Sequence, residues 1–194
     1  MKIGRNSLAA ATLIAGIAAL AACNAPPAPA PSAGTPAAAS RPQSQVEGDL
    51  RQVMRGILFP NSNVVFLAQG TDPASVPKDA DGTTSVNPLA SVYGGWEAIE
   101  NSSIALAEAA NLLTIPGRMC ANGKPVPVQN ADWQRFVQGL RDAGMASYKA
   151  AQTKDMDKML DAADTLTNAC SECHDVYREK TEQRGGDAAR CTAQ

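Results

Sequence analysis

The chain has 194 residues with 17 basic and 19 acidic side chains, a formal net charge of −2 at neutral pH. This length suits one domain of ordinary size. The nearly balanced charge gives no reason to expect nucleic acid or an anionic lipid surface as a partner.

The N-terminus has the pattern of a secretory signal. Lys2 and Arg5 precede an apolar run, residues 8–22, that is short for a membrane span. The run ends Leu-Ala-Ala-Cys23, which resembles a bacterial lipobox. We therefore expect cleavage after residue 22, lipidation of Cys23 and a periplasmic protein anchored to a membrane. The alternative is an ordinary signal peptide that leaves Cys23 as a free thiol. Loss of the two basic residues would change the formal charge from −2 to −4.

Residues 23–45 are dominated by Ala, Pro and Ser, so we expect an extended tether with no core of its own. The folded domain is expected to span residues 46–186, followed by a tail at 187–194.

Apolar residues at helical spacing predict four helices in this domain. The expected helices run from about Val46 to Leu58, from Val92 to Leu113, from the residue after Asn130, and from the residue after Asp155 to Gly185 and Gly186. Pro60 should kink or interrupt the first helix. No alternating strand pattern competes. The predicted fold class is all-α, an antiparallel up-down-up-down four-helix bundle.

One motif carries the chemistry. Cys170-Ser-Glu-Cys173-His174 has the C-x-x-C-H spacing of covalent haem attachment, in which two thiols bind the haem and the imidazole becomes an axial iron ligand. On a helix these three side chains share one face. A redox C-x-x-C pair would need an α/β context. Zinc would need further ligands from Cys120 and Cys191, because the chain has a single histidine.

The segment from Ala169 to Arg178 resembles cytochrome c-prime and its low-spin, six-coordinate relatives. Those proteins are exported four-helix bundles with the attachment motif late in the last helix. The resemblance covers about residues 46–184, and it implies one covalently attached haem c with Arg178 close to it. Tyr177 is expected to pack against the haem. Arg51 is expected either to pair with a haem propionate or to be an ordinary solvated side chain.

The second iron ligand is predicted from the number of histidines in the chain and from the expected level of Met54 relative to His174. Because His174 is the only histidine, a haem with two histidine ligands from one chain is excluded. Met54 is expected at the same level as His174 on the facing helix, and relatives place a distal methionine on that helix. The alternative is that Met54 is a core residue. Met119 is the rival ligand.

Cys120 and Cys191 remain after haem and lipid are assigned. Both are expected at the pole where the fourth helix ends, so an exported protein could pair them in a disulfide. Two free thiols are the alternative.

These features predict a one-electron carrier rather than an enzyme, since no catalytic constellation is visible. Its partner would be another redox protein, and a homodimer is left open. The alternative function is the binding of nitric oxide or carbon monoxide at an open distal haem face.

Overall fold

The computed structural model describes residues 44–178 and Cys191. The chain divides into two units, Met1–Arg41 and Pro42–Gln194, and the description concerns the second. The predicted signal peptide, Cys23 and most of the predicted tether lie outside the described residues. In the described part of the chain, no helix is long and apolar enough to cross a membrane.

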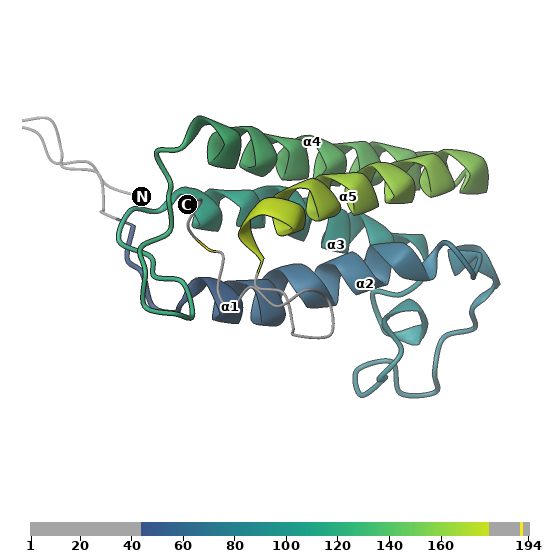
Figure 1. The fold of residues 1–194 in the computed structure, drawn as a ribbon. Helices are drawn as coiled ribbons and strands as arrows, with labels where there is room; N and C mark the ends of the chain where they lie inside the picture. Colours follow the sequence, from purple (N-terminus) through teal and green to yellow (C-terminus); the bar gives the residue numbers. More distant parts are fainter. Residues whose placement is uncertain (1–43, 179–190, 192–194) are drawn as a thin grey trace, which may run out of the picture. The chain divides into compact units, whose positions relative to one another are not determined.

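The described unit is all-α, with four helices packed against one another (Figure 1). Its elements are α1 (Leu50–Val53), the π-helical turn η1 (Met54–Leu58), α2 (Phe59–Leu67), the 3-10 turns η2 (Pro73–Ser75) and η3 (Pro88–Ala90), α3 (Trp96–Ala109), η4 (Ala110–Thr114), α4 (Ala131–Thr153) and α5 (Met156–Tyr177). The first of the four helices is the continuous run α1–η1–α2. Between residues 44 and 178 there is no strand, only an isolated bridge between Met119 and Pro125.

The first helix begins at Leu50, so the predicted start near Val46 is wrong. Asp49 and Gln52 form a capping box that fixes the boundary. The Asp49 carboxylate accepts a hydrogen bond from the Gln52 backbone N–H (2.7 Å), and the Gln52 side chain accepts one from the Asp49 N–H (2.8 Å). These bonds satisfy helix N–H groups that would otherwise have no partner.

Of the two predicted effects of Pro60, a kink or an interruption, the structure contradicts the interruption, because the helical run continues through Pro60. Instead, the turn before it widens into the π-helix η1, where the Phe59 N–H bonds to the Met54 carbonyl five residues back. A proline lacks an N–H and its ring clashes with the carbonyl four residues earlier, so a wider turn relieves the contact. The extra residue also places Val53 and Leu58 together in the core at a spacing of five.

The second predicted helix begins four residues later than expected. The chain enters α3 at Trp96 through Gly95, whose φ of 69° is left-handed and favours glycine. The preceding Gly94 is also required, because a Cβ there would lie 2.2 Å from the Leu89 carbonyl oxygen. Val92, the predicted start, is an exposed residue of the incoming loop.

The predicted starts of the last two helices are confirmed. The helix α4 follows Asn130, and α5 follows Asp155, whose carboxylate accepts hydrogen bonds from the Asp157 and Lys158 N–H groups. The predicted end of the fourth helix at Gly185 is wrong, because α5 ends at Tyr177 and Arg178 has extended backbone angles. The segment 179–190 lies outside the described residues.

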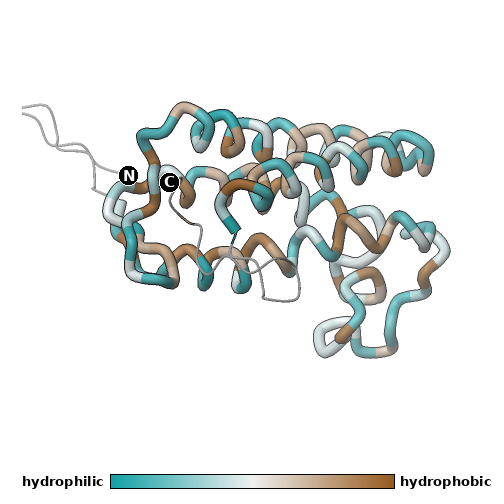
Figure 2. The backbone as a smooth tube through the Cα atoms, in the orientation of Figure 1, coloured by the Kyte–Doolittle hydropathy of each residue, from teal (hydrophilic) through white to brown (hydrophobic). Residues whose placement is uncertain are grey.

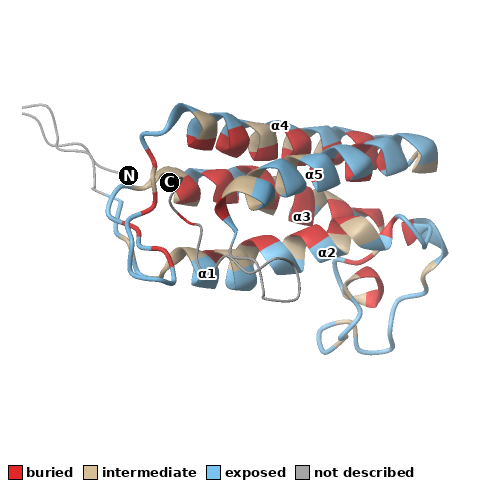
Figure 3. Ribbon diagram, in the orientation of Figure 1, coloured by how far each residue is buried: buried red, intermediate tan, exposed pale blue. Residues whose placement is uncertain are grey.

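Packing between the helices is uneven. Apolar and polar residues interchange along each helix (Figure 2), and the buried sides of the helices face one another (Figure 3). The helix α3 packs extensively on α4, and α4 on α5, whereas α2 touches α5 at few positions. The helix that carries the C-x-x-C-H motif is therefore held mainly by α4.

Candidate functional site

The motif occupies the last two turns of α5 and divides cleanly between two helix faces. Its three predicted haem-binding residues are half-buried: Cys170, Cys173 and His174. The intervening and following residues are exposed: Ser171, Glu172 and Asp175. Both cysteines also pack against the hydrophobic core of the bundle. The side chains with ligand chemistry therefore lie on the inward side, and the charged ones face solvent.

Cys170 and Cys173 both carry free thiols and are not joined to each other. Burial raises the pKa of the Cys170 thiol. Burial raises the pKa of Cys173 to about 12, with smaller contributions from Cys170 and from the Asp132 carboxylate. A redox-active C-x-x-C pair depends on a thiol with a depressed pKa. The environment of these thiols has the opposite effect on their pKa values.

His174 is half-buried beside the two thiols. Burial lowers the pKa of its imidazole, the Arg178 guanidinium lowers it further, and Asp175 opposes the change. The neutral imidazole that results is the form that binds metal ions. Arg178 itself is exposed and caps α5, with its N–H bonded to the His174 carbonyl (3.1 Å).

Tyr177, one turn further along, ties the end of α5 to the start of α4. Its hydroxyl donates a hydrogen bond to Asp132 Oδ1 (2.7 Å), and its ring lies edge-on to Trp133 (5.0 Å between centroids) and Phe136 (6.2 Å). Only 4% of Tyr177 is exposed. Sequence reasoning proposed that Tyr177 packs against the haem and missed these α4 partners, because nothing in the local pattern links residues 45 positions apart.

The predicted distal residues lie on the first helix and in the loop after η4. Met54 opens the π turn and is partly buried against the core. Met119, the rival, is 41% exposed, and its carbonyl accepts the Leu50 N–H (2.8 Å). Arg51 is exposed on α1. Met54 lies four residues after Leu50, the first residue of α1. His174 lies three residues before Tyr177, the last residue of α5.

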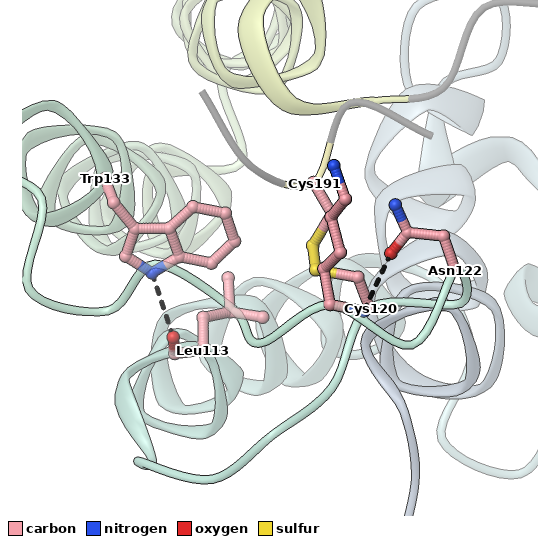
Figure 4. The surroundings of a disulfide bond; sticks show 6 residues. Leu113, Cys120, Asn122, Trp133 and Cys191 are labelled. Carbon is pink, nitrogen blue, oxygen red and sulfur yellow. Dashed lines mark hydrogen bonds between the residues drawn. A yellow bond between two sulfur atoms is a disulfide. The ribbon is translucent and has the colours of Figure 1, made fainter. Parts of the chain in front are cut away.

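The structure pairs Cys120 with Cys191 in a disulfide, with 5.8 Å between their Cα atoms (Figure 4). This separation lies in the usual range for the bond, so the pairing predicted from the sequence is sterically compatible with the fold. In the same region the Trp133 Nε1–H donates to the Leu113 carbonyl (3.0 Å), which fixes α4 against η4.

Arg118 is a structurally important residue that the sequence analysis did not single out. It is almost fully buried, and its guanidinium donates to the backbone carbonyls of Leu112 (3.0 Å) and Gly48 (2.5 Å). These bonds join the loop after η4 both to η4 itself and to the segment before α1, where Gly48 lies 70 residues before Arg118. Arg118 thus fixes the entry of the helix that carries Met54.

Within residues 44–178 and Cys191, no group of three or more His, Cys, Asp or Glu side chains is arranged to hold a metal ion. No protein-family model, curated protein or solved structure matches the chain. The functional assignment must therefore come from the chemistry of the site.

Proposed function

We propose that the chain is a c-type cytochrome that carries one electron at a time, with a single haem c bound covalently through Cys170 and Cys173 and ligated by His174. The observation that supports this most directly is the division of the motif between two helix faces. Two free thiols and an imidazole lie together on the core-facing side of α5, which is the donor set that covalent haem attachment requires.

The residues present fit this cofactor better than the two alternatives. A zinc site would need Cys120 and Cys191 as further ligands, and a disulfide between these two cysteines would leave neither thiolate for a metal ion. A dithiol oxidoreductase would need a reactive thiolate, but burial raises the pKa of both motif thiols. Haem attachment uses all three motif residues and needs no others.

When bound, the haem supplies one-electron redox chemistry at its iron. The chain's own residues would hold and orient it. His174 would supply a nitrogen ligand to the iron, and the helix that also carries the two thiols would fix its orientation. Met54 is the candidate distal ligand because of its level in the proposed up-down-up-down bundle, where the first helix starts at the end where α5 finishes. Met54 lies about 6 Å along its helix from Leu50, and His174 lies about 4.5 Å before the end of α5, so the two residues would lie at similar depths from that end.

The same proposal includes the finer architecture and the location of the protein. An up-down-up-down bundle of the cytochrome c-prime kind would bring the start of the first helix beside the end of the last. Lipidation of Cys23 would anchor the protein to a membrane on the periplasmic side. A saturated iron with His174 and Met54 as ligands favours electron transfer to another redox protein over gas binding.

The test is whether haem remains on the polypeptide after denaturation. The protein is produced in a host that attaches haem to exported cytochromes, denatured, and examined for a haem absorption band that migrates with the chain. The wild type should retain the band, and Cys170→Ala with Cys173→Ala should lose it. The matched control, Cys120→Ser with Cys191→Ser, also removes two cysteines and should keep it. A wild-type chain without covalent haem would overturn the proposal.

A further inference from the structure

We propose that Asp132 is the carboxylate that sets the reduction potential of the haem site, and that the Tyr177 hydroxyl controls how strongly its charge acts there. This inference rests on the proposed function, and it names two residues that determine a property of the same site. It follows from a contact between α4 and α5 that haem attachment itself does not use.

The contact is held in place from several sides. Asp132 Oδ1 accepts hydrogen bonds from the Tyr177 hydroxyl (2.7 Å) and from the Trp133 backbone N–H (2.9 Å). The Asn130 side chain donates to the Tyr177 oxygen (3.5 Å). Edge-on packing against Trp133 fixes the ring of Tyr177. The hydroxyl and the carboxylate therefore keep one geometry.

The Asp132–Tyr177 pair lies beside the C-x-x-C-H motif of residues 170–174. Tyr177 follows Cys173 by four residues on α5, so the two side chains lie on the same side of the helix. The Tyr177 hydroxyl holds the Asp132 carboxylate at 2.7 Å, one helix turn along α5 from Cys173. In agreement with this placement, burial and, to a smaller extent, the Asp132 charge raise the pKa of the Cys173 thiol, and the sulfur of that thiol is the atom that would join the haem edge. Asp175 and Arg178 are the charged groups that act on His174 from α5 itself.

The sign of the effect follows from Coulomb's law. An oxidised haem carries one more positive charge than a reduced one, so a nearby carboxylate stabilises the oxidised form and lowers the reduction potential. A hydrogen bond donated by Tyr177 withdraws part of that negative charge and weakens the effect. The step is the addition of one electron, and the Tyr177 proton stays on its oxygen in both states.

The experiment is a redox titration of the haem-loaded full chain, followed by its optical spectrum. Asp132→Asn removes the charge but keeps an acceptor oxygen, and should raise the potential. Tyr177→Phe keeps the ring but removes the donor, and should lower it. The double variant should match Asp132→Asn, because the hydroxyl then has no charge to modulate. Tyr148→Phe and Asp142→Asn, which lie elsewhere on α4, are the controls and should leave the potential unchanged.

Opposite shifts of the two single variants separate an electrostatic role from a structural one. If the contact only braces the helices, both variants loosen it, and shifts in the same direction or no shifts would overturn the inference. Should Asp132→Asn fail to accumulate, Tyr177→Phe still decides, since anything but a lowered potential contradicts the proposal. Failure of these shifts with covalent haem intact leaves the proposed function standing, whereas absence of haem overturns both.

Discussion

Gly144 of α4 lies so close to Ala107 of α3 that a Cβ atom on Gly144 would be 2.9 Å from the Ala107 backbone nitrogen and 3.0 Å from the Ser103 carbonyl oxygen. Atoms of the backbone cannot move aside as a flexible side chain can. The close approach of α3 and α4 therefore depends on a residue with no side chain at this position.

We expect Gly144→Ala to lower the free energy of unfolding by about 1–3 kcal/mol, because the added methyl group forces the two helices apart. Gly139→Ala is the matched control on the same helix, since a Cβ there would meet nothing within 4 Å. It should raise the stability by about 0.5–1 kcal/mol through helix propensity. Chemical denaturation of both variants measures the difference, and equal effects would contradict the packing argument.

Ser147, one turn further along α4, is buried, and its hydroxyl has no hydrogen-bond partner among the described residues. Ser147→Ala should raise the free energy of unfolding by about 1 kcal/mol, because a buried hydroxyl without a partner costs desolvation energy. Ser103→Ala is the comparison. Its hydroxyl donates to the Ile99 carbonyl (2.7 Å), so this variant should lose about 0.5–1.5 kcal/mol. A stability loss in Ser147→Ala would indicate that a partner for its hydroxyl exists.

The Cys120–Cys191 bond closes a separation of 71 residues. The chain-entropy estimate for a loop of this size is about 4 kcal/mol. Reduction, or the variant Cys191→Ser, should lower the free energy of unfolding by up to that amount. Peptide mapping without reductant should yield a linked fragment that contains both cysteines. Recovery of two separate, alkylatable peptides would show that the pair is not bonded.

Met54→Ala tests the distal ligand. If Met54 binds the iron, the variant should change from a low-spin to a high-spin optical spectrum and should bind carbon monoxide readily. Met119→Ala, an exposed residue of the loop after η4, is the control and should keep the wild-type spectrum. An unchanged Met54→Ala spectrum would assign this residue to the core. A wild-type spectrum that already responds to carbon monoxide would favour the gas-binding alternative.

Cys23→Ser tests the anchor. The variant should leave the membrane fraction while its haem spectrum stays unchanged, because the predicted tether separates the lipid from the folded unit. The measurement is fractionation of cells that express each form, with processing of the signal checked by mass. Membrane retention of a correctly processed Cys23→Ser chain would contradict lipidation.

Short-range signals in the sequence predict the starts of α4 and α5 correctly, whereas the predicted helix starts at Val46 and Val92 and the predicted end at Gly185 are wrong. Helices α4 and α5 begin after Asn130 and Asp155 as predicted. The Asp155 carboxylate caps α5 by accepting hydrogen bonds from N–H groups two and three residues ahead. The Asn130 side chain makes no capping bond and donates to the Tyr177 oxygen instead. The C-x-x-C-H motif, proposed to attach haem, is equally local. Its three residues share one face of any α-helix that contains them, so their grouping did not depend on the rest of the fold.

Only the tertiary structure decided the remaining features, because each depends on groups that are distant in the chain or on packing that propensity does not describe. Val53 and Leu58 are both buried in the core although they are five residues apart, and the π turn before Pro60 is what brings them to the same side of the helix. The bond between Tyr177 and Asp132 joins residues 45 positions apart, and no local pattern predicts it. The sequence by itself placed Cys170, Cys173 and His174 on one helix face, and it predicts the haem chemistry proposed for them. The packing of α5 on α4 decided which charge lies beside them.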